Sequence, residues 1–196
     1  MPMSPCLRLF PGFTLILFGI SFAINAQAGD PAQDGLAIAL QNDKANQGFG
    51  TDQSIMEMVL INAHGDKTTR RMLSETLEGK DDGDKSVATF QWPADVKGTK
   101  MLTHTKKVGD DQQWLFLPAI KRVKRISSKN KSGSFMGSEF SYEDLGSQEV
   151  EKFTYALIGD STHEGRAVWH MNRTPTDKRS GYSKQVVWID KEYHSP

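Results

Sequence analysis

The sequence predicts a mainly β protein with short helices, in which successive antiparallel strands form a curled or closed meander. Two observations support this class. From Thr51 onward, short segments of β-branched, aromatic and alternating residues succeed one another, and turn signals rich in Gly and Asp separate them. Several of these segments are also apolar at consecutive positions, which indicates strands whose two faces are both covered.

The first element, Met1 to Ala28, is predicted to be a cleavable signal peptide. Arg8 precedes an apolar run from Phe13 to Ile24, and Ala26-Gln27-Ala28 follows as a small-x-small cleavage pattern. A transmembrane helix needs about 20 apolar residues, so an uncleaved anchor is the weaker interpretation. We therefore expect an exported protein that begins at Gly29, lacks Cys6 and has no disulfide to stabilise it.

One short helix is predicted next. Asp30 can cap it, Pro31 suits its first turn, and apolar residues at helical spacing continue until Gly48. The predicted strands are 54–61, 67–77, 86–92, 101–106, 112–117, 121–126, 153–158, 167–173 and 184–189. The turn signals His64-Gly65-Asp66, Val108-Gly109-Asp110 and His163-Glu164-Gly165 predict antiparallel hairpins between neighbours. The size of the exported part fits one domain.

Both faces of some strands are apolar, as in Trp114-Leu115-Phe116-Leu117. Helices are expected to cover one face, and either a ligand or a further helix the other. The segment from Ser127 to Tyr142 breaks the strand pattern: it is rich in Ser, Gly and Lys and ends in large apolar residues. This composition predicts a mobile loop that could act as a lid. A short helix is expected over Asp144 to Lys152.

No catalytic or metal-binding pattern is present. The five histidines are scattered without ligand spacing, and neither a nucleophile elbow nor a phosphate-binding loop occurs. The acidic turn from Asp81 to Asp84 lacks the downstream Glu of a calcium loop. The chain carries 24 Lys and Arg against 24 Asp and Glu, which disfavours a nucleic-acid partner. We therefore expect no enzyme, no cofactor and no metal.

A basic run of alternating residues precedes the flexible loop. Its candidates for contact with lipid headgroups or an acidic partner are Lys121, Arg122, Lys124 and Arg125, although lysines on an edge strand also protect against aggregation. Methionines recur along the strands, at Met56, Met58, Met72, Met101 and Met136. Their flexible side chains suit either an ordinary core or a pocket for variable acyl chains.

Three motifs follow one another along the chain: Trp92-Pro93-Ala94-Asp95-Val96-Lys97-Gly98-Thr99-Lys100-Met101-Leu102, then Gln113-Trp114-Leu115-Phe116-Leu117-Pro118, then Gly133-Ser134-Phe135-Met136-Gly137-Ser138-Glu139-Phe140-Ser141-Tyr142-Glu143-Asp144-Leu145. Together they resemble the outer-membrane lipoprotein-sorting protein family, of LolA-like type. The resemblance extends from about Ala37 to Asp190. It implies a periplasmic protein with an unclosed antiparallel β-barrel, covered by helices, whose apolar cavity carries acyl chains of lipoproteins or other lipids.

The resemblance also implies partners: an RND-type inner-membrane exporter or an outer-membrane acceptor. Candidates for the cavity lining are the large apolar residues Trp92, Trp114, Phe116, Phe135, Met136, Phe140 and Trp169. One departure is that the sequence stops at Tyr193-His194-Ser195-Pro196, where family members continue with further strands. Residues 29–196 are then either a C-terminally incomplete domain or a complete one with an exposed sheet edge.

Three other interpretations remain open at this stage. A small outer-membrane β-barrel would share the strand and turn pattern, but charges are scattered over the strands here. A periplasmic accessory or scaffold module of an RND-type transporter would have a packed interior and bind no lipid. An enzyme is the weakest alternative, because no polar residues converge in a recognisable constellation.

Overall fold

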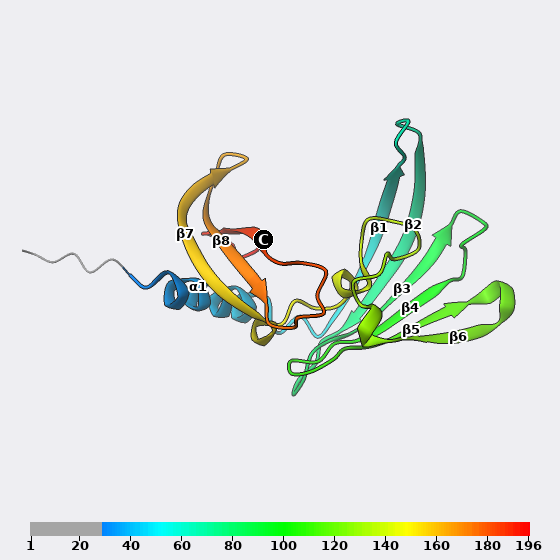
Figure 1. Ribbon diagram of the computed structural model, residues 1–196, viewed down its shortest axis with the longest axis horizontal. Coiled ribbons are helices and arrows are strands. Elements are labelled where there is room, and N and C mark those ends of the chain that lie inside the picture. The colour runs from blue at the N-terminus through cyan, green and yellow to red at the C-terminus, as the bar shows by residue number, and fades with distance from the viewer. Residues whose placement is uncertain (1–28) are drawn as a thin grey trace, which may run out of the picture.

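The computed structural model describes residues 29–196, so the predicted signal peptide lies outside the described residues. One α-helix and nine strands make up the regular structure of this part (Figure 1). Their bounds are α1 Pro31–Ala45, β1 Thr51–Ile61, β2 Lys67–Leu77, β3 Lys85–Trp92, β4 Lys100–His104, β5 Gln112–Leu117, β6 Arg122–Ile126, β7 Phe153–His163, β8 Arg166–Pro175 and β9 Gln185–Asp190.

The helix α1 begins where the capping residues predict. The Asp30 carboxylate accepts a hydrogen bond from the backbone N–H of Ala32, and Pro31 occupies the first turn. Gly35, Ile38 and Ala39 are the buried positions of the helix, and they face β7. A Cβ on Gly35 would lie 2.9 Å from the backbone nitrogen of Leu157, so glycine allows the helix to approach this strand closely.

Strands β1 to β6 form a six-stranded antiparallel sheet in sequential order (Figure 1). The predicted hairpins among these six strands are confirmed, and β2 and β5 have the predicted bounds. Strands β7, β8 and β9 form a separate three-stranded antiparallel sheet, on which α1 packs. Neither sheet closes on itself, so the prediction of an unclosed antiparallel β architecture is confirmed.

One face of the six-stranded sheet carries its core, and we call this face the covered face. The register places Met101 opposite Ala88 and Leu115, and Met72 opposite Phe90. Residues 127–145, here called the covering segment, pack against these side chains. A second core lies between α1 and the three-stranded sheet, where Ile38 and Ala39 meet the buried residues Tyr155, Met171 and Ile189.

Two details of the sequence prediction are corrected. The predicted helix over Asp144 to Lys152 is instead two short 3₁₀ turns, Tyr142–Leu145 and Val150–Lys152, because Gly146 adopts an extended conformation between them. The opposite face of the six-stranded sheet, here called the open face, has no covering element among residues 29–196, and Ile55 on it is 69% exposed. Among residues 29–196, the covered face thus lies under the irregular segment 127–145, whereas α1 packs on the three-stranded sheet. No helix in the described part of the chain is long and apolar enough to span a membrane.

Candidate functional site

The covering segment inserts one aromatic side chain into the covered face. Phe135 is completely buried, with its ring centroid 5.8 Å from that of Phe90 and 5.9 Å from that of Tyr142. Met136, Tyr142 and Leu145 of the same segment pack around it while remaining partly exposed. A segment without long regular elements therefore fills the space above the sheet.

The tip of the covering segment is a tight turn with its own hydrogen bonds. The N–H of Phe135 donates to the carbonyl of Phe140 over 2.7 Å, and Ser134 pairs with Ser141 in a short antiparallel bridge. Met136 and Gly137 both have positive φ, of 52° and 72°. A methionine rarely adopts this left-handed conformation, so the surrounding contacts must hold it there.

Two long side chains tie the covering segment to the sheet. The guanidinium of Arg70 on β2 donates to the carbonyl oxygen of Met136 over 2.5 Å. The buried amide of Gln113 on β5 donates to the carbonyl oxygen of Tyr142 over 2.7 Å. These bonds satisfy backbone carbonyls of an irregular segment that would otherwise depend on water.

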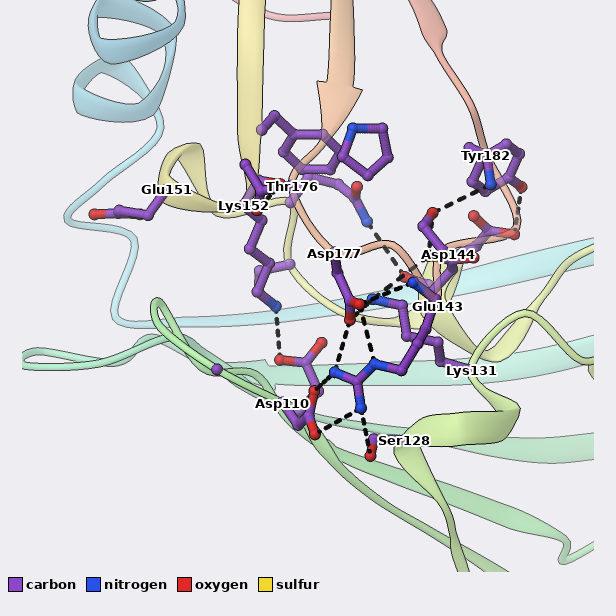
Figure 2. Close-up of a pocket in the computed structure, with 18 of the residues that line it drawn as sticks. Asp110, Ser128, Lys131, Glu143, Asp144, Glu151, Lys152, Thr176, Asp177 and Tyr182 are labelled. Carbon is purple, nitrogen blue, oxygen red and sulfur yellow. Dashed lines mark hydrogen bonds and ion pairs between the residues drawn. The ribbon is translucent and has the colours of Figure 1, made fainter.

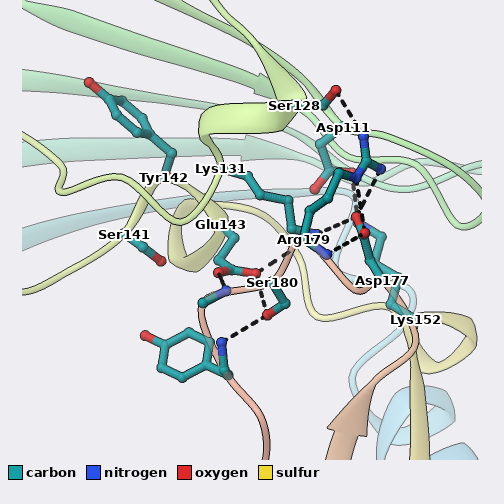
Figure 3. A network of polar contacts seen from close by, with 12 residues as sticks. Asp111, Ser128, Lys131, Ser141, Tyr142, Glu143, Lys152, Asp177, Arg179 and Ser180 are labelled. Atoms are coloured by element: carbon teal, nitrogen blue, oxygen red, sulfur yellow. Dashed lines mark hydrogen bonds and ion pairs between the residues drawn. The ribbon is translucent and has the colours of Figure 1, made fainter.

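The base of the covering segment is attached to residues 176–182, which connect β8 and β9 (Figure 3). The Glu143 carboxylate accepts hydrogen bonds from the backbone N–H of Gly181 over 2.7 Å and from the Ser180 hydroxyl over 2.8 Å. Lys131 bridges Asp177 at 2.9 Å and Glu143 at 3.8 Å. We call this set of contacts the polar clasp, because it joins the covering segment to the three-stranded sheet.

Arg179, labelled in Figure 3, extends the polar clasp to the turn between β4 and β5, where Figure 2 labels Asp110. Its guanidinium forms ion pairs with Asp110 and Asp177 and also donates to the Ser128 hydroxyl. Hydrogen bonding from Arg179 holds the pKa of Asp177 well below its usual range. The pocket at this position, of about 290 Å³, is lined by paired charges, and no cluster of potential metal ligands exists in residues 29–196.

A larger cavity of about 640 Å³ lies between α1, the β2–β3 turn and the three-stranded sheet. Tyr155, Met171, Val187 and Ile189 contribute apolar side chains to its lining. Burial raises the pKa of Tyr155 to about 12, so its hydroxyl is neutral at physiological pH. The cavity has the size of a small-molecule site, but its rim carries many charged side chains.

The predicted lining residues are distributed over several surfaces. Phe135 and Met136 meet on the covered face, whereas Trp114 and Phe116 lie half-buried on the open face. Trp92 and Phe140 are each 53% exposed. Trp169 lies on the three-stranded sheet, stacked on His194 with 5.7 Å between ring centroids. Of the seven predicted lining residues, only Phe135 and Met136 therefore come together on the covered face.

The sheet residues that form the apolar surface beneath Phe135 were not among the seven predicted lining residues. They are Met58, Met72, Phe90, Met101 and Leu115. Apolar residues alternate along these strands in the sequence. This alternation could identify the core residues only once the structure had shown which face is covered. The predicted basic contacts Lys121, Arg122, Lys124 and Arg125 are all exposed on or beside β6, at one edge of the sheet.

The architecture defines a class: an antiparallel β-protein with an open sheet whose apolar face lies under a long irregular segment. A LolA superfamily protein from Nitrosomonas europaea shares this fold, with a TM-score of 0.55 at 17% identity over 86% of this chain and 70% of that one. The similarity at this level of identity concerns the fold alone.

Two other structures are much more similar in sequence. A domain from Vibrio parahaemolyticus, assigned to the outer membrane lipoprotein-sorting proteins, is 50% identical, with a TM-score of 0.81 over 84% of this chain and 70% of that chain. A DUF1329 family protein from Desulfovibrio piger is 32% identical, with a TM-score of 0.75 over 83% and 70% of the two chains. This chain therefore belongs to the family of the outer membrane lipoprotein-sorting protein domain.

A family model described only as that of an uncharacterized protein matches residues 82–196. No curated protein matches the chain. The fold of this chain is thus shared with a lipoprotein-sorting protein domain, a DUF1329 family protein and a LolA superfamily protein.

Proposed function

We propose that this protein is a periplasmic carrier that binds acyl chains of lipoproteins or other lipids between the covering segment and the covered face. The observation that carries the proposal is the position of Phe135, a completely buried side chain on a segment with only short 3₁₀ turns. An acyl chain that enters here would take the place of this ring. The carrier role requires no catalytic residue.

The apolar sheet surface beneath Phe135 suits a ligand of variable shape. Met72 and Met101 are buried directly in it, and Met58 lies at its margin on β1. Methionine side chains adapt to irregular apolar surfaces because they are unbranched and flexible. Gly133 and Gly146 flank residues 134–145, so small conformational changes at these glycines could move this part of the covering segment.

The energies of opening and of binding can be compared. Exposing Phe135 to water costs about 1.5–3 kcal/mol, and burying each methylene contributes about 0.8 kcal/mol. About four methylenes therefore offset the loss of the phenylalanine contacts. A long acyl chain would exceed this amount and hold the segment open, so release would depend on an acceptor that binds the chain at least as strongly.

The proposed location and partners follow from this chemistry. Cleavage after Ala28 would release residues 29–196 as one LolA-like unit into the periplasm, where free acyl chains are insoluble. Handover to or from an envelope membrane protein, such as an RND-type exporter, would supply the acceptor. A non-lipid-binding accessory module of such a transporter is the alternative.

The methionines allow a direct test. Met72, Met101 and Met136 surround the proposed site, whereas Met171 lies in the core of the three-stranded sheet and serves as an internal control. Protein purified without detergent and labelled with ¹³C at the methionine methyl groups is titrated with lysophosphatidylglycerol below its micelle concentration. We expect the resonances of the first three to shift and that of Met171 to stay unchanged.

Mass spectrometry of organic extracts from the same protein would identify lipid that co-purifies. If no methionine resonance shifts and no lipid is extracted, the carrier proposal fails and the accessory-module alternative is favoured. A shift confined to Met171 would also contradict the proposed site, because it would place the ligand in the 640 Å³ cavity that this residue lines.

A further inference from the structure

The open face of the six-stranded sheet is apolar over a wide area. The strand register aligns Val87, Leu102 and Trp114 in one row across β3, β4 and β5, and it places Phe116 beside Val123 in the next row. Ile55 on β1 and Val123 on β6 are 69% and 65% exposed. Thr89 and Lys100 lie between Ile55 and Val123 in the register. Several exposed apolar side chains on one sheet face are nevertheless uncommon on a soluble protein unless they bind something.

Basic side chains border this apolar surface. Arg125 lies opposite Trp114, and Lys100 lies between Thr89 and Phe116. The register places Arg122 and Lys124 opposite Leu117 and Leu115, on the covered face, so Arg125 is the basic residue of β6 on the open face. Lys85, opposite His104, is a further basic residue of the open face, and Lys121 directly precedes β6. Lys85, Lys100, Lys121 and Arg125 form no ion pair with any residue in 29–196.

Acidic side chains on the open face are few, and each interacts with a neighbouring side chain. Glu57 lies 3.8 Å from Arg71, and Glu75 accepts a hydrogen bond from Gln53. The uncompensated charge of the open face and its β6 edge is therefore positive. An occupant must then be apolar where it meets the strands and anionic where it meets β6.

We propose that the open face and the β6 edge dock on the surface of a bilayer that contains anionic phospholipid. Exposed aliphatic side chains would enter the headgroup region, and the half-buried Trp114 would lie at the interface, where tryptophan is favoured. Lys85, Lys100, Lys121 and Arg125 would contact phosphate groups, each contributing to binding in a salt-dependent way. The proposal extends the carrier function, since cargo exchange requires an approach to a membrane, but it concerns the sheet face opposite the proposed cargo site.

Charge reversal at the edge tests the electrostatic part. Co-sedimentation of the purified protein is measured with vesicles of phosphatidylglycerol and phosphatidylethanolamine, and with vesicles of phosphatidylcholine alone. We expect binding only to the anionic vesicles, and a loss of about 100-fold or more in the triple edge variant Lys100→Glu, Lys121→Glu, Arg125→Glu, which reverses three of the bordering charges. The matched control Lys44→Glu, Lys178→Glu, Lys184→Glu reverses three lysines elsewhere and should bind like the unaltered protein.

Substitution of exposed apolar residues tests the hydrophobic part of the proposed membrane docking. Ile55→Ser with Val123→Ser should weaken vesicle binding by about tenfold or more. Ile158→Ser with Val186→Ser, at exposed positions of the three-stranded sheet, should leave it unchanged. Neither open-face variant should alter the methionine shifts caused by lysophosphatidylglycerol, so failure of docking and failure of cargo binding are distinguishable.

Three outcomes would overturn the proposal. One is equal binding to anionic and phosphatidylcholine vesicles, and another is full binding by the triple edge variant. The third is a dimer in solution that dissociates on Ile55→Ser and Val123→Ser, since the open face would then bind a second copy of the chain.

Discussion

Arg70 on β2 donates a hydrogen bond to the carbonyl oxygen of Met136, whose φ is 52°. The bond links the sheet to the tip of the covering segment at the residue with the least favourable backbone conformation. Because Phe135 precedes this residue, the same bond also holds the buried ring in position. Loosening of this contact is thus the simplest way to begin opening the covering segment.

Replacement of Arg70 by leucine should loosen the covering segment without unfolding the sheet. A hydrogen bond from a charged donor contributes about 1.5–3 kcal/mol, less where the donor is partly exposed. We expect faster hydrogen exchange at the amides of residues 135–142, measured by mass spectrometry, and little change in β7 to β9. Arg71→Leu is the control, because this neighbour points to the open face and forms only an exposed ion pair at 3.8 Å. Equal exchange in the two variants would contradict the role of Arg70.

Truncation of Phe135 should be the most costly single change in the covering segment. Phe135→Ala removes a completely buried ring, and such changes cost about 3–5 kcal/mol. Phe140→Ala, in the same turn but 53% exposed, should change the free energy of unfolding by less than about 1 kcal/mol. Urea denaturation measures both. A cost for Phe135→Ala as small as that for Phe140→Ala would show that this ring contributes little to the core.

Gly35→Ala should destabilise the protein, although alanine normally favours a helix over glycine by about 1 kcal/mol. The reason is the close approach of α1 to β7: the new Cβ would lie 2.9 Å from the nitrogen of Leu157 and 3.0 Å from that of Ala156. Thermal unfolding should therefore begin at a lower temperature. Gln33→Ala, at an exposed position of the same helix, should raise stability slightly or leave it unchanged. A stabilising Gly35→Ala would contradict this close approach of helix and strand.

Because of Glu149, the free energy of unfolding should decrease as the pH rises. Burial, and then the nearby Asp84 carboxylate, raise the pKa of Glu149 above its ordinary value. The folded chain therefore binds this proton more tightly than the unfolded chain does, and this contribution to stability is lost as the pH rises through the folded pKa.

Glu149→Gln should accordingly increase the free energy of unfolding at neutral pH and flatten its pH dependence above the ordinary pKa of glutamate. Urea denaturation at several pH values measures this effect. Glu151→Gln, two residues away and exposed, is the control and should keep the slope of the unaltered protein. If both variants keep that slope, burial does not shift the titration of Glu149.

Local features were predictable from the sequence. Strands β2 and β5 begin and end where the alternation and the turn residues place them, and α1 starts after Asp30. These elements depend on periodicity, capping and turn chemistry over a few residues. The three family motifs likewise predicted the LolA-like fold that the related structures share.

The sequence predicted α1 and the order of the nine strands, because each of these elements depends on neighbours along the chain. Tertiary packing settles which strand face is covered, and with it why Phe135 is buried while Trp114 remains half-exposed. It also decided the contacts of Arg70 with Met136 and of Glu143 with Gly181. Such contacts join residues far apart in the chain, and they form only when packing brings two surfaces together.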